Sequence, residues 1–257
     1  TIKETTGNAA EDQAVEESRS LKQHVKSAWY SFKSGAVTCF SFVSPIGLSY
    51  LPKLFTNSFG ITRPMEHPDQ VGLDKKVLEK KNIGLDVAGE AIIYGIPQED
   101  RLKMAESALR AMSLTDNFAK SVLIIGHGSS TVNNPHASGL DCGACGGQSG
   151  EANAKVAAAV LNDTAVREGL KKTGIEIPES TVFIACKHDT TTDEVTLFNT
   201  KNLPPSHDED IAKIKYSLKM AAESSRNERG LRMNLQGEKI AENVLKRSTD
   251  WSQVRPE

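Results

Sequence analysis

Residues 121–147, SVLIIGHGSSTVNNPHASGLDCGACGG, decide how this chain folds around its most reactive side chains. The first five residues form a short, continuous apolar run that ends at Gly126, a pattern that predicts a buried β-strand. The residues that follow combine two histidines, two cysteines and an aspartate with several glycines. An ordinary surface loop rarely keeps two thiols, so the stretch predicts a strand followed by a loop that binds a ligand or carries chemistry.

The sequence downstream supplies the rest of an α/β unit. Residues 181–185 (TVFIA) predict a second strand, and residues 195–198 (VTLF) predict a possible third. Between the first two strands, the Ala-rich residues 150–161 predict a helix, and Asp163 or Thr164 can cap another. The order strand, loop, helix, strand predicts a parallel βαβ unit with a right-handed crossover. The expected fold class is therefore α/β with a parallel sheet.

Three regions follow from this pattern. Residues 1–95 are expected to form a mainly helical scaffold, residues 96–200 the α/β core, and residues 201–257 a helical extension. In the extension, SHDE at residues 206–209 matches a capping box, which predicts the start of a long helix. That helix is expected to run to about Ser225.

The N-terminal region contains an uncharged stretch, SGAVTCFSFVSPIGLSYLP at residues 34–52. Its length approaches a membrane span, but its serines and the prolines at 45 and 52 argue against a transmembrane helix. We expect a buried or interface helix pair there, preceded by an apolar-striped helix over residues 10–32. The polar, acidic start of the chain has neither the basic nor the apolar region of a secretory signal peptide.

Composition narrows the classes of function. The chain has 257 residues, a net charge of −2 and 5% aromatic residues, so neither charge nor stacking surface favours nucleic-acid binding. Four cysteines are too few and too unevenly spread for a disulfide framework. Cys142 and Cys145 form a C-x-x-C pair, which is typical of a metal or redox role in a reducing compartment.

The two main predicted strands end in GHGSS and CKHDTTTDE. Sites in open α/β sheets form at the carboxyl ends of strands, so His127, His188 and Asp189 are expected to converge. Cys142 and Cys145 precede a predicted helix, whose N-terminus favours a thiolate. Because thiolate and imidazole together are zinc ligands, a metal site is the leading hypothesis.

Other interpretations stay open on the residues alone. The C-x-x-C can be redox-active, both cysteines can be small buried hydrophobes, or the glycines can hold phosphate, although GK[ST] and G-x-G-x-x-G are absent. Zinc needs four ligands in a closed site, or three and water in a catalytic one. His127 with one or both of Cys142 and Cys145 supplies two or three. The others either lie outside the chain or come from Asp141, Cys186, His188 or Asp189.

Three motifs carry a resemblance to a known family. They are GHGSSTVNNPHASGLDCGACGGQSGEANAKVAAAVLND at residues 126–163, HDTTTDEVTLF at 188–198 and RSTDWSQVRPE at 247–257. In content and order they resemble the DabA family, formerly uncharacterised, whose members are large bacterial subunits of energy-coupled inorganic-carbon pumps. AWYSFKSGAVTCFSFV at residues 28–43 also resembles the family's helical segment before the site.

The resemblance implies a site like that of β-carbonic anhydrase. The family's zinc histidine in GHGS corresponds to His127, and its zinc cysteine corresponds to Cys142 rather than Cys145. Its other two ligands, a cysteine and an aspartate, come from an upstream C-x-D-x-R motif, and no C-x-D occurs in this chain. The chain therefore resembles the C-terminal part of a longer DabA protein, and carries half of its zinc ligands.

For the intact protein, the resemblance implies Zn²⁺-dependent hydration of CO2 to bicarbonate. Its implied partner is a membrane subunit that translocates protons, DabB-like, and its implied place is peripheral, on the cytoplasmic face of the cell (inner) membrane. His188 and Asp189 are candidates for supporting the metal ligands. The chain alone is predicted to be inactive.

Two alternatives belong to other classes of protein. One is an interaction scaffold, whose helical N-terminal third docks a partner. The other is a self-contained zinc or redox module, with ligands from Cys142, Cys145, His127 and one of His136 or His188.

Overall fold

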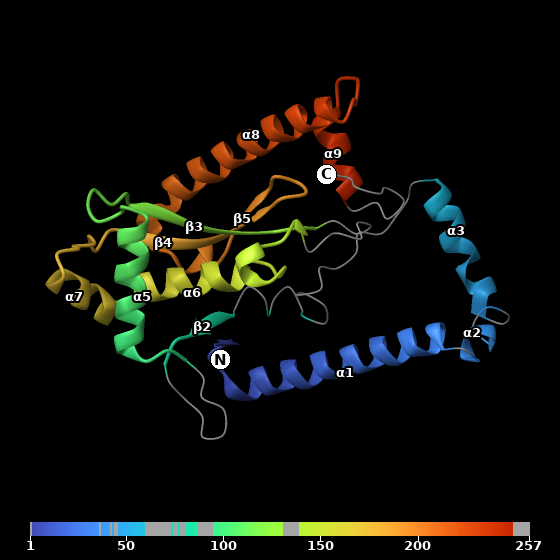
Figure 1. Ribbon diagram of the computed structural model, residues 1–257, viewed down its shortest axis with the longest axis horizontal. Coiled ribbons are helices and arrows are strands. Elements are labelled where there is room, and N and C mark those ends of the chain that lie inside the picture. The colour runs from blue at the N-terminus through green and yellow to red at the C-terminus, as the bar shows by residue number, and fades with distance from the viewer. Residues whose placement is uncertain are drawn as a thin grey trace.

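The computed structural model describes residues 2–35, 37–41, 43, 46–59, 73, 77, 81–86, 95–130 and 139–248. The central feature is a three-stranded sheet in the order β3-β4-β5. Its strands are β3 (Ser121–Gly128), β4 (Val182–Asp189) and β5 (Val195–Leu197). Figure 1 shows this sheet between helix α6 on one side and helix α8 on the other.

The first two strands are parallel, as the sequence predicts, and the third is not. β3 and β4 pair in parallel from Ser121 with Val182 to Gly128 with Asp189. β5, whose direction the sequence leaves open, pairs antiparallel with β4, so the predicted parallel βαβ unit is part of a mixed sheet. The physical reason is the short loop between β4 and β5, because only a long crossover connection allows parallel neighbours.

Helices α6 (Glu151–Asn162) and α7 (Thr164–Lys172) connect β3 to β4 and complete the βαβ unit. Asp163 caps α7, since its carboxylate accepts hydrogen bonds from the backbone N–H groups of Ala165 and Val166. Helix α5 (Gln98–Ala111) packs against α6 and α7. The core between these helices and the sheet is built from apolar side chains, among them Leu109, Val160, Val166, Leu170, Ile175 and Phe183.

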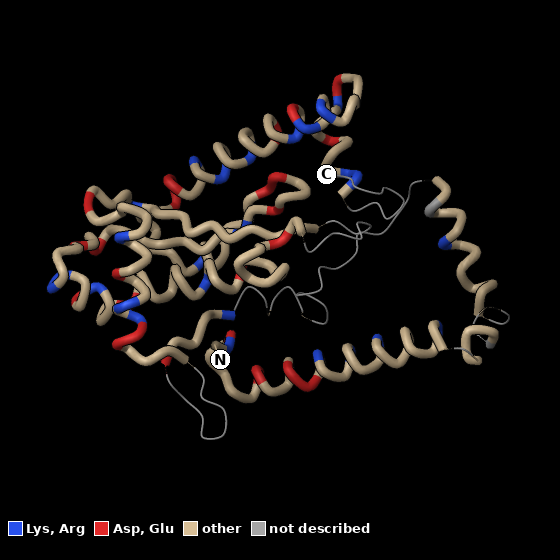
Figure 2. Tube along the Cα trace, viewed as in Figure 1, with Lys and Arg blue, Asp and Glu red and all other residues tan. Residues whose placement is uncertain are grey.

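The N-terminal region contains β1 (Lys3–Thr5), α1 (Ala9–Ser34), α2 (Thr38–Ser41), a 3₁₀ helix (Gly47–Tyr50), α3 (Leu51–Ser58) and β2 (Asn82–Gly84). β1 and β2 form an antiparallel pair. Figure 1 shows α1 leading from this pair away from the central sheet towards α2 and α3. In Figure 2 the acidic residues of α1 gather in its first half.

The uncharged stretch forms short helices, but their described side chains are not buried. Phe40 is 74% exposed and Leu48 is 69% exposed, so the expected helix pair is not buried within the chain at these residues, and the interface alternative stays a prediction. Among the described residues, none of the helices combines the length and the apolar character that crossing a membrane requires.

The C-terminal region forms α8 (Asp208–Arg232) and α9 (Ile240–Ser248), which pack together. The predicted capping box is wrong. Ser206 lies in a 3₁₀ helix (Pro205–His207), and no side chain caps α8. His207 lies directly before α8 and is buried, with its Nε2 atom 3.1 Å from the carbonyl oxygen of Ser180. Acidic residues in the first turn of α8 stabilise its positive N-terminal end.

Candidate metal site

The carboxyl ends of β3 and β4 bring the predicted site residues of both strands together. In the parallel register His127 lies beside His188, and Gly128 lies beside Asp189. His127 is exposed, on the face of β3 opposite the one that α6 covers, because side chains alternate along a strand. His188 lies near the loop that follows β4, with its Nε2 atom 3.6 Å from a carboxylate oxygen of Asp193.

Two glycines bring the cysteine-containing loop to this same end of the sheet. The backbone N–H of Gly150 donates a hydrogen bond of 2.7 Å to the carbonyl oxygen of His127. A Cβ atom at Gly126 would lie 2.3 Å from the carbonyl oxygen of Gly150, and one at Gly150 would lie 2.9 Å from the amide nitrogen of His127. Only glycine at both positions allows this approach. The start of α6 is therefore fixed against the strand end that carries His127.

We expect Gly126→Ala to destabilise the fold by roughly 1–3 kcal/mol, because the added methyl group overlaps backbone that cannot rotate away. Urea denaturation of the chain measures this effect. Gly143→Ala is the matched control, since a Cβ atom at Gly143 meets no atom within 4 Å. Equal stability of the two variants would contradict the close packing of β3 against α6.

The two cysteines lie in a tight turn before α6. The backbone N–H of Cys142 donates to the carbonyl oxygen of Gln148, and the carbonyl oxygen of Cys142 accepts from the backbone N–H of Cys145. Hydrogen bonds from the side chain and then the backbone of Cys145 lower the pKa of the Cys142 thiol. The hydrogen bond with Cys142 raises the pKa of Cys145, and the amide of Asn153 lies 3.1 Å from the Cys145 sulfur. Cys142 is therefore the more readily deprotonated of the two.

The loop after β4 joins the histidine strand to the cysteine loop. The hydroxyl of Thr190 lies 2.8 Å from the carbonyl oxygen of Leu140 and 3.1 Å from that of Gly128. The backbone N–H of Thr190 also donates to the Gly128 oxygen, at 2.8 Å. Next to it, the backbone N–H of Ser130 donates to the hydroxyl of Thr191. Thr190 thus ties the end of β3 to the residue two positions before Cys142.

Two arginines of α8 fix this loop from outside the sheet. Arg226 donates to the carbonyl oxygen of Thr192 at 2.6 Å. Arg229 donates to the carbonyl oxygens of Thr190 and Thr191 and forms an ion pair of 2.7 Å with Asp193. Neither arginine could be identified from the sequence as part of this region. Nothing in the local sequence pairs a helix with a loop more than thirty residues upstream.

Two aspartates considered at the sequence level serve the backbone in this structure. One carboxylate oxygen of Asp189 accepts from the backbone N–H groups of Thr191 and Thr192, at 2.9 and 3.3 Å. Asp189 therefore shapes its own loop. A carboxylate oxygen of Asp141 accepts from the backbone N–H of Ser129 at 2.7 Å, which adds another link between the cysteine loop and the end of β3.

The side chains at this end of the sheet include donor types that zinc binds, but too few of them to complete a zinc site. His127 supplies an imidazole and Cys142 a thiol, the two donor types that structural zinc sites use. Within the described ranges, no group of three or more His, Cys, Asp or Glu side chains is placed to hold a metal ion. His136 lies outside the described residues. Cys186 faces the apolar cluster under α8, and burial raises its thiol pKa to about 12, so it is not a ligand here.

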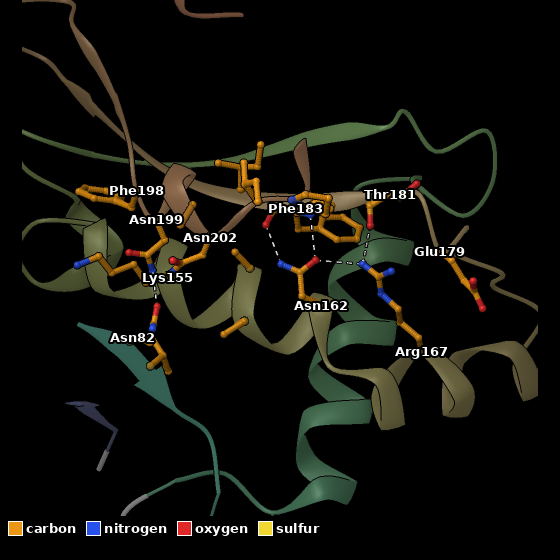
Figure 3. A pocket seen from close by; sticks show the side chains of 18 residues that line it. Asn82, Lys155, Asn162, Arg167, Glu179, Thr181, Phe183, Phe198, Asn199 and Asn202 are labelled. Atoms are coloured by element: carbon orange, nitrogen blue, oxygen red, sulfur yellow. Dashed lines mark hydrogen bonds between the residues drawn. The ribbon is translucent and has the colours of Figure 1, made fainter. Parts of the chain in front are cut away.

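A cavity of about 430 Å³ lies elsewhere, along the first half of β4, beside α6 and β2 (Figure 3). Several of its polar side chains are paired within the protein. The amide of Asn162 hydrogen-bonds both the N–H and the C=O of Phe183, which replaces the neighbour that β5 does not reach. Lys155 pairs with Glu4 and Glu151. The lining includes none of the predicted site residues, and these pairings stabilise the sheet edge.

Comparison with known proteins identifies the family to which this chain is similar. The model of the family described as "Probable inorganic carbon transporter subunit DabA" matches residues 1–257. A protein of that name from Roseiflexus castenholzii is 50% identical over 263 residues, which cover all of this chain and 31% of the relative. Namesakes from Chloroflexus aggregans and Acidithiobacillus ferrooxidans are 49% and 44% identical, covering 96% and 99% of this chain and 30% and 32% of their own lengths. No solved structure matches.

Proposed function

The chain belongs to the DabA family of probable inorganic carbon transporter subunits, and from this premise we propose that it forms part of an energy-coupled inorganic-carbon pump. The chain spans about a third of the length of the relatives it matches, so the activity proposed is that of the family-length protein. Where this third lies within that protein stays a prediction.

The proposed chemistry is zinc-dependent hydration of CO2 to bicarbonate. His127 and Cys142 would hold the ion together with ligands from outside residues 1–257. Bound zinc supplies a nucleophile at neutral pH, because it lowers the pKa of water from 15.7 to about 7. The observation that supports this assignment is that the Gly126–Gly150 contact and Thr190 hold the His127 strand end and the Cys142 loop at one end of the sheet.

This chain's own residues would do the positioning. The paired backbone of Gly150 and His127 fixes the strand end, and the turn closed by the Cys142 and Gln148 hydrogen bond fixes the cysteine. A site held this rigidly loses little conformational entropy when its ligands are ordered around an ion. We further propose a membrane-bound, proton-translocating partner subunit and a peripheral position on the cytoplasmic face of the membrane. The support is the relatives' name as transporter subunits.

The direct test of function is accumulation of isotopically labelled inorganic carbon in cells that lack their own carbonic anhydrase. Cells that produce the family-length protein with its partner are expected to accumulate label, and cells with the His127→Ala variant are not. Normal accumulation by a stably folded His127→Ala variant would contradict the proposal.

Thr190 offers a test of the positioning argument. In the family-length protein, Thr190→Val removes the hydroxyl that reaches the cysteine loop, and we expect zinc affinity to fall about 10- to 100-fold, as for other groups that orient metal ligands. Thr192→Val is the matched control, because the Thr192 hydroxyl accepts a hydrogen bond from the backbone N–H of Glu194, within its own loop. Chelator competition, at a temperature where circular dichroism shows both variants folded, measures the difference. Equal affinities would exclude a positioning role for Thr190.

A further inference from the structure

Strand β3 has an open edge. In a parallel pair of strands, every second residue directs its backbone N–H and C=O groups towards the neighbouring strand. The carbonyl oxygens of Lys120 and Gly128 accept hydrogen bonds from the N–H groups of Val182 and Thr190, so the even-numbered residues of β3 face β4. Leu123 and Ile125 are odd-numbered, so their backbone N–H and C=O groups point away from β4. Within the part of the chain that the structure describes, no backbone hydrogen bond reaches them.

The side chains of β3 do not suit an edge strand. Natural edge strands are protected by charges, prolines, bulges or short length, whereas residues 122–125 of β3 are an unbroken run of Val, Leu and Ile. One face of β3 packs into the core under α6, and the other into the cluster under α8. Strands with apolar side chains on both faces are typical of the interior of parallel sheets.

Comparison with β4 shows what β3 lacks. β4 pairs with β3 along its whole length and with β5 from Cys186 to His188, and within that doubly paired stretch Cys186 is 0% exposed. β3 has the same apolar character, but Ile125 remains 47% exposed. At the carboxyl end of the open edge, the carbonyl oxygen of His127 already accepts from Gly150, so the unpaired stretch runs from Ser121 to Ile125.

We propose that one further β-strand, from the part of the family-length protein outside residues 1–257, pairs with Ser121–Ile125 and makes β3 an interior strand. The relatives are long enough to contain such a strand, because the alignment that covers all of this chain covers only 31% of the Roseiflexus castenholzii protein. The strand is parallel to β3, as the two covered faces of β3 favour. This pairing rests on the hydrogen bonds and burial of β3, and does not depend on the proposed zinc chemistry.

The direction of the strand has a consequence for the candidate site. The carboxyl ends of parallel strands lie at the same edge of a sheet, where α/β proteins form their sites. The added strand would therefore end beside His127, at the limit that the Gly150 hydrogen bond sets. Its last residues would lie at the end of the sheet that carries the Cys142 loop.

Single-residue hydrogen exchange tests this pairing, in the family-length protein and in the chain of residues 1–257. In the family-length protein the amides of Leu123 and Ile125 are expected to exchange as slowly as those of Val122 and Ile124, which face β4. In the shorter chain they are expected to exchange at least about 100-fold faster than those of Val122 and Ile124, as at an open edge. Protection of Val122 and Ile124 shows in the same sample that the chain is folded.

Three results would overturn the proposal. Fast exchange at Leu123 and Ile125 in the family-length protein would show that the edge stays open. Slow exchange in the monomeric shorter chain would place the pairing strand within residues 1–257. Protection that appears only as the shorter chain dimerises, with the mass measured by light scattering, would identify a second copy as the occupant. If the shorter chain does not protect Val122 and Ile124, the family-length result alone decides.

Discussion

Replacing Cys142 with serine in the family-length protein is expected to remove its zinc and to abolish inorganic-carbon accumulation. A thiolate binds zinc far more strongly than a serine hydroxyl, and losing one ligand of four opens the site. Zinc content should fall from about one ion per chain to less than about a tenth. His127→Ala should have the same effect. Elemental analysis of the purified variants, with labelled-carbon uptake in cells, measures both outcomes.

Cys145→Ser is the matched control, since it changes the second thiol of the same turn. The Cys145 sulfur contacts the amide of Asn153. The resemblance to the DabA family implies that Cys142, rather than Cys145, is the zinc-binding cysteine. We therefore expect the Cys145→Ser variant to keep its zinc and its uptake. Equal loss of zinc in the two cysteine variants would favour a self-contained module in which both thiols are ligands.

The chain of residues 1–257 alone is expected neither to hold zinc tightly nor to hydrate CO2. In the proposed assignment His127 and Cys142 supply two ligands, and the described residues include no group of three or more side chains placed to hold a metal ion. Apparent zinc affinities of about 10–16 kcal/mol depend on a complete ligand set. The measurement is zinc titration against a competing chelator, for this chain and for the family-length protein. Stoichiometric, chelator-resistant zinc in the shorter chain would mean that Asp141, Cys145, His136 or His188 completes the site.

Much of the core could be predicted because its signals are local. The apolar runs at 121–125 and 181–185 mark the two parallel strands, and Asp163 caps a helix through atoms only two or three residues away. The placement of His127 beside His188 follows from the same pattern, since parallel neighbours end at one edge. These features depend on side-chain periodicity and on contacts within one turn of chain.

What the sequence could not predict depends on contacts between distant segments. Arg229 of α8, for example, reaches the carbonyl oxygen of Thr190 across 39 positions. His207 is buried by carbonyl groups of two loops distant in sequence. From the sequence alone Cys186 is a possible metal ligand, but in the structure its side chain lies in the apolar cluster under α8. In each case, packing between elements overrides what the neighbouring residues favour.

X-ray absorption at the zinc edge of the family-length protein reports the ligand atoms themselves, and so decides whether Cys142 binds zinc. We expect mixed sulfur and nitrogen or oxygen ligands, with zinc–sulfur distances near 2.3 Å and zinc–nitrogen distances of about 2.0–2.1 Å. If the variants are reloaded with excess zinc, Cys142→Ser should lose one sulfur from the shell, and Cys145→Ser should lose none. A zinc shell without sulfur, or one that Cys142→Ser leaves unchanged, would contradict the assignment of Cys142 as a zinc ligand.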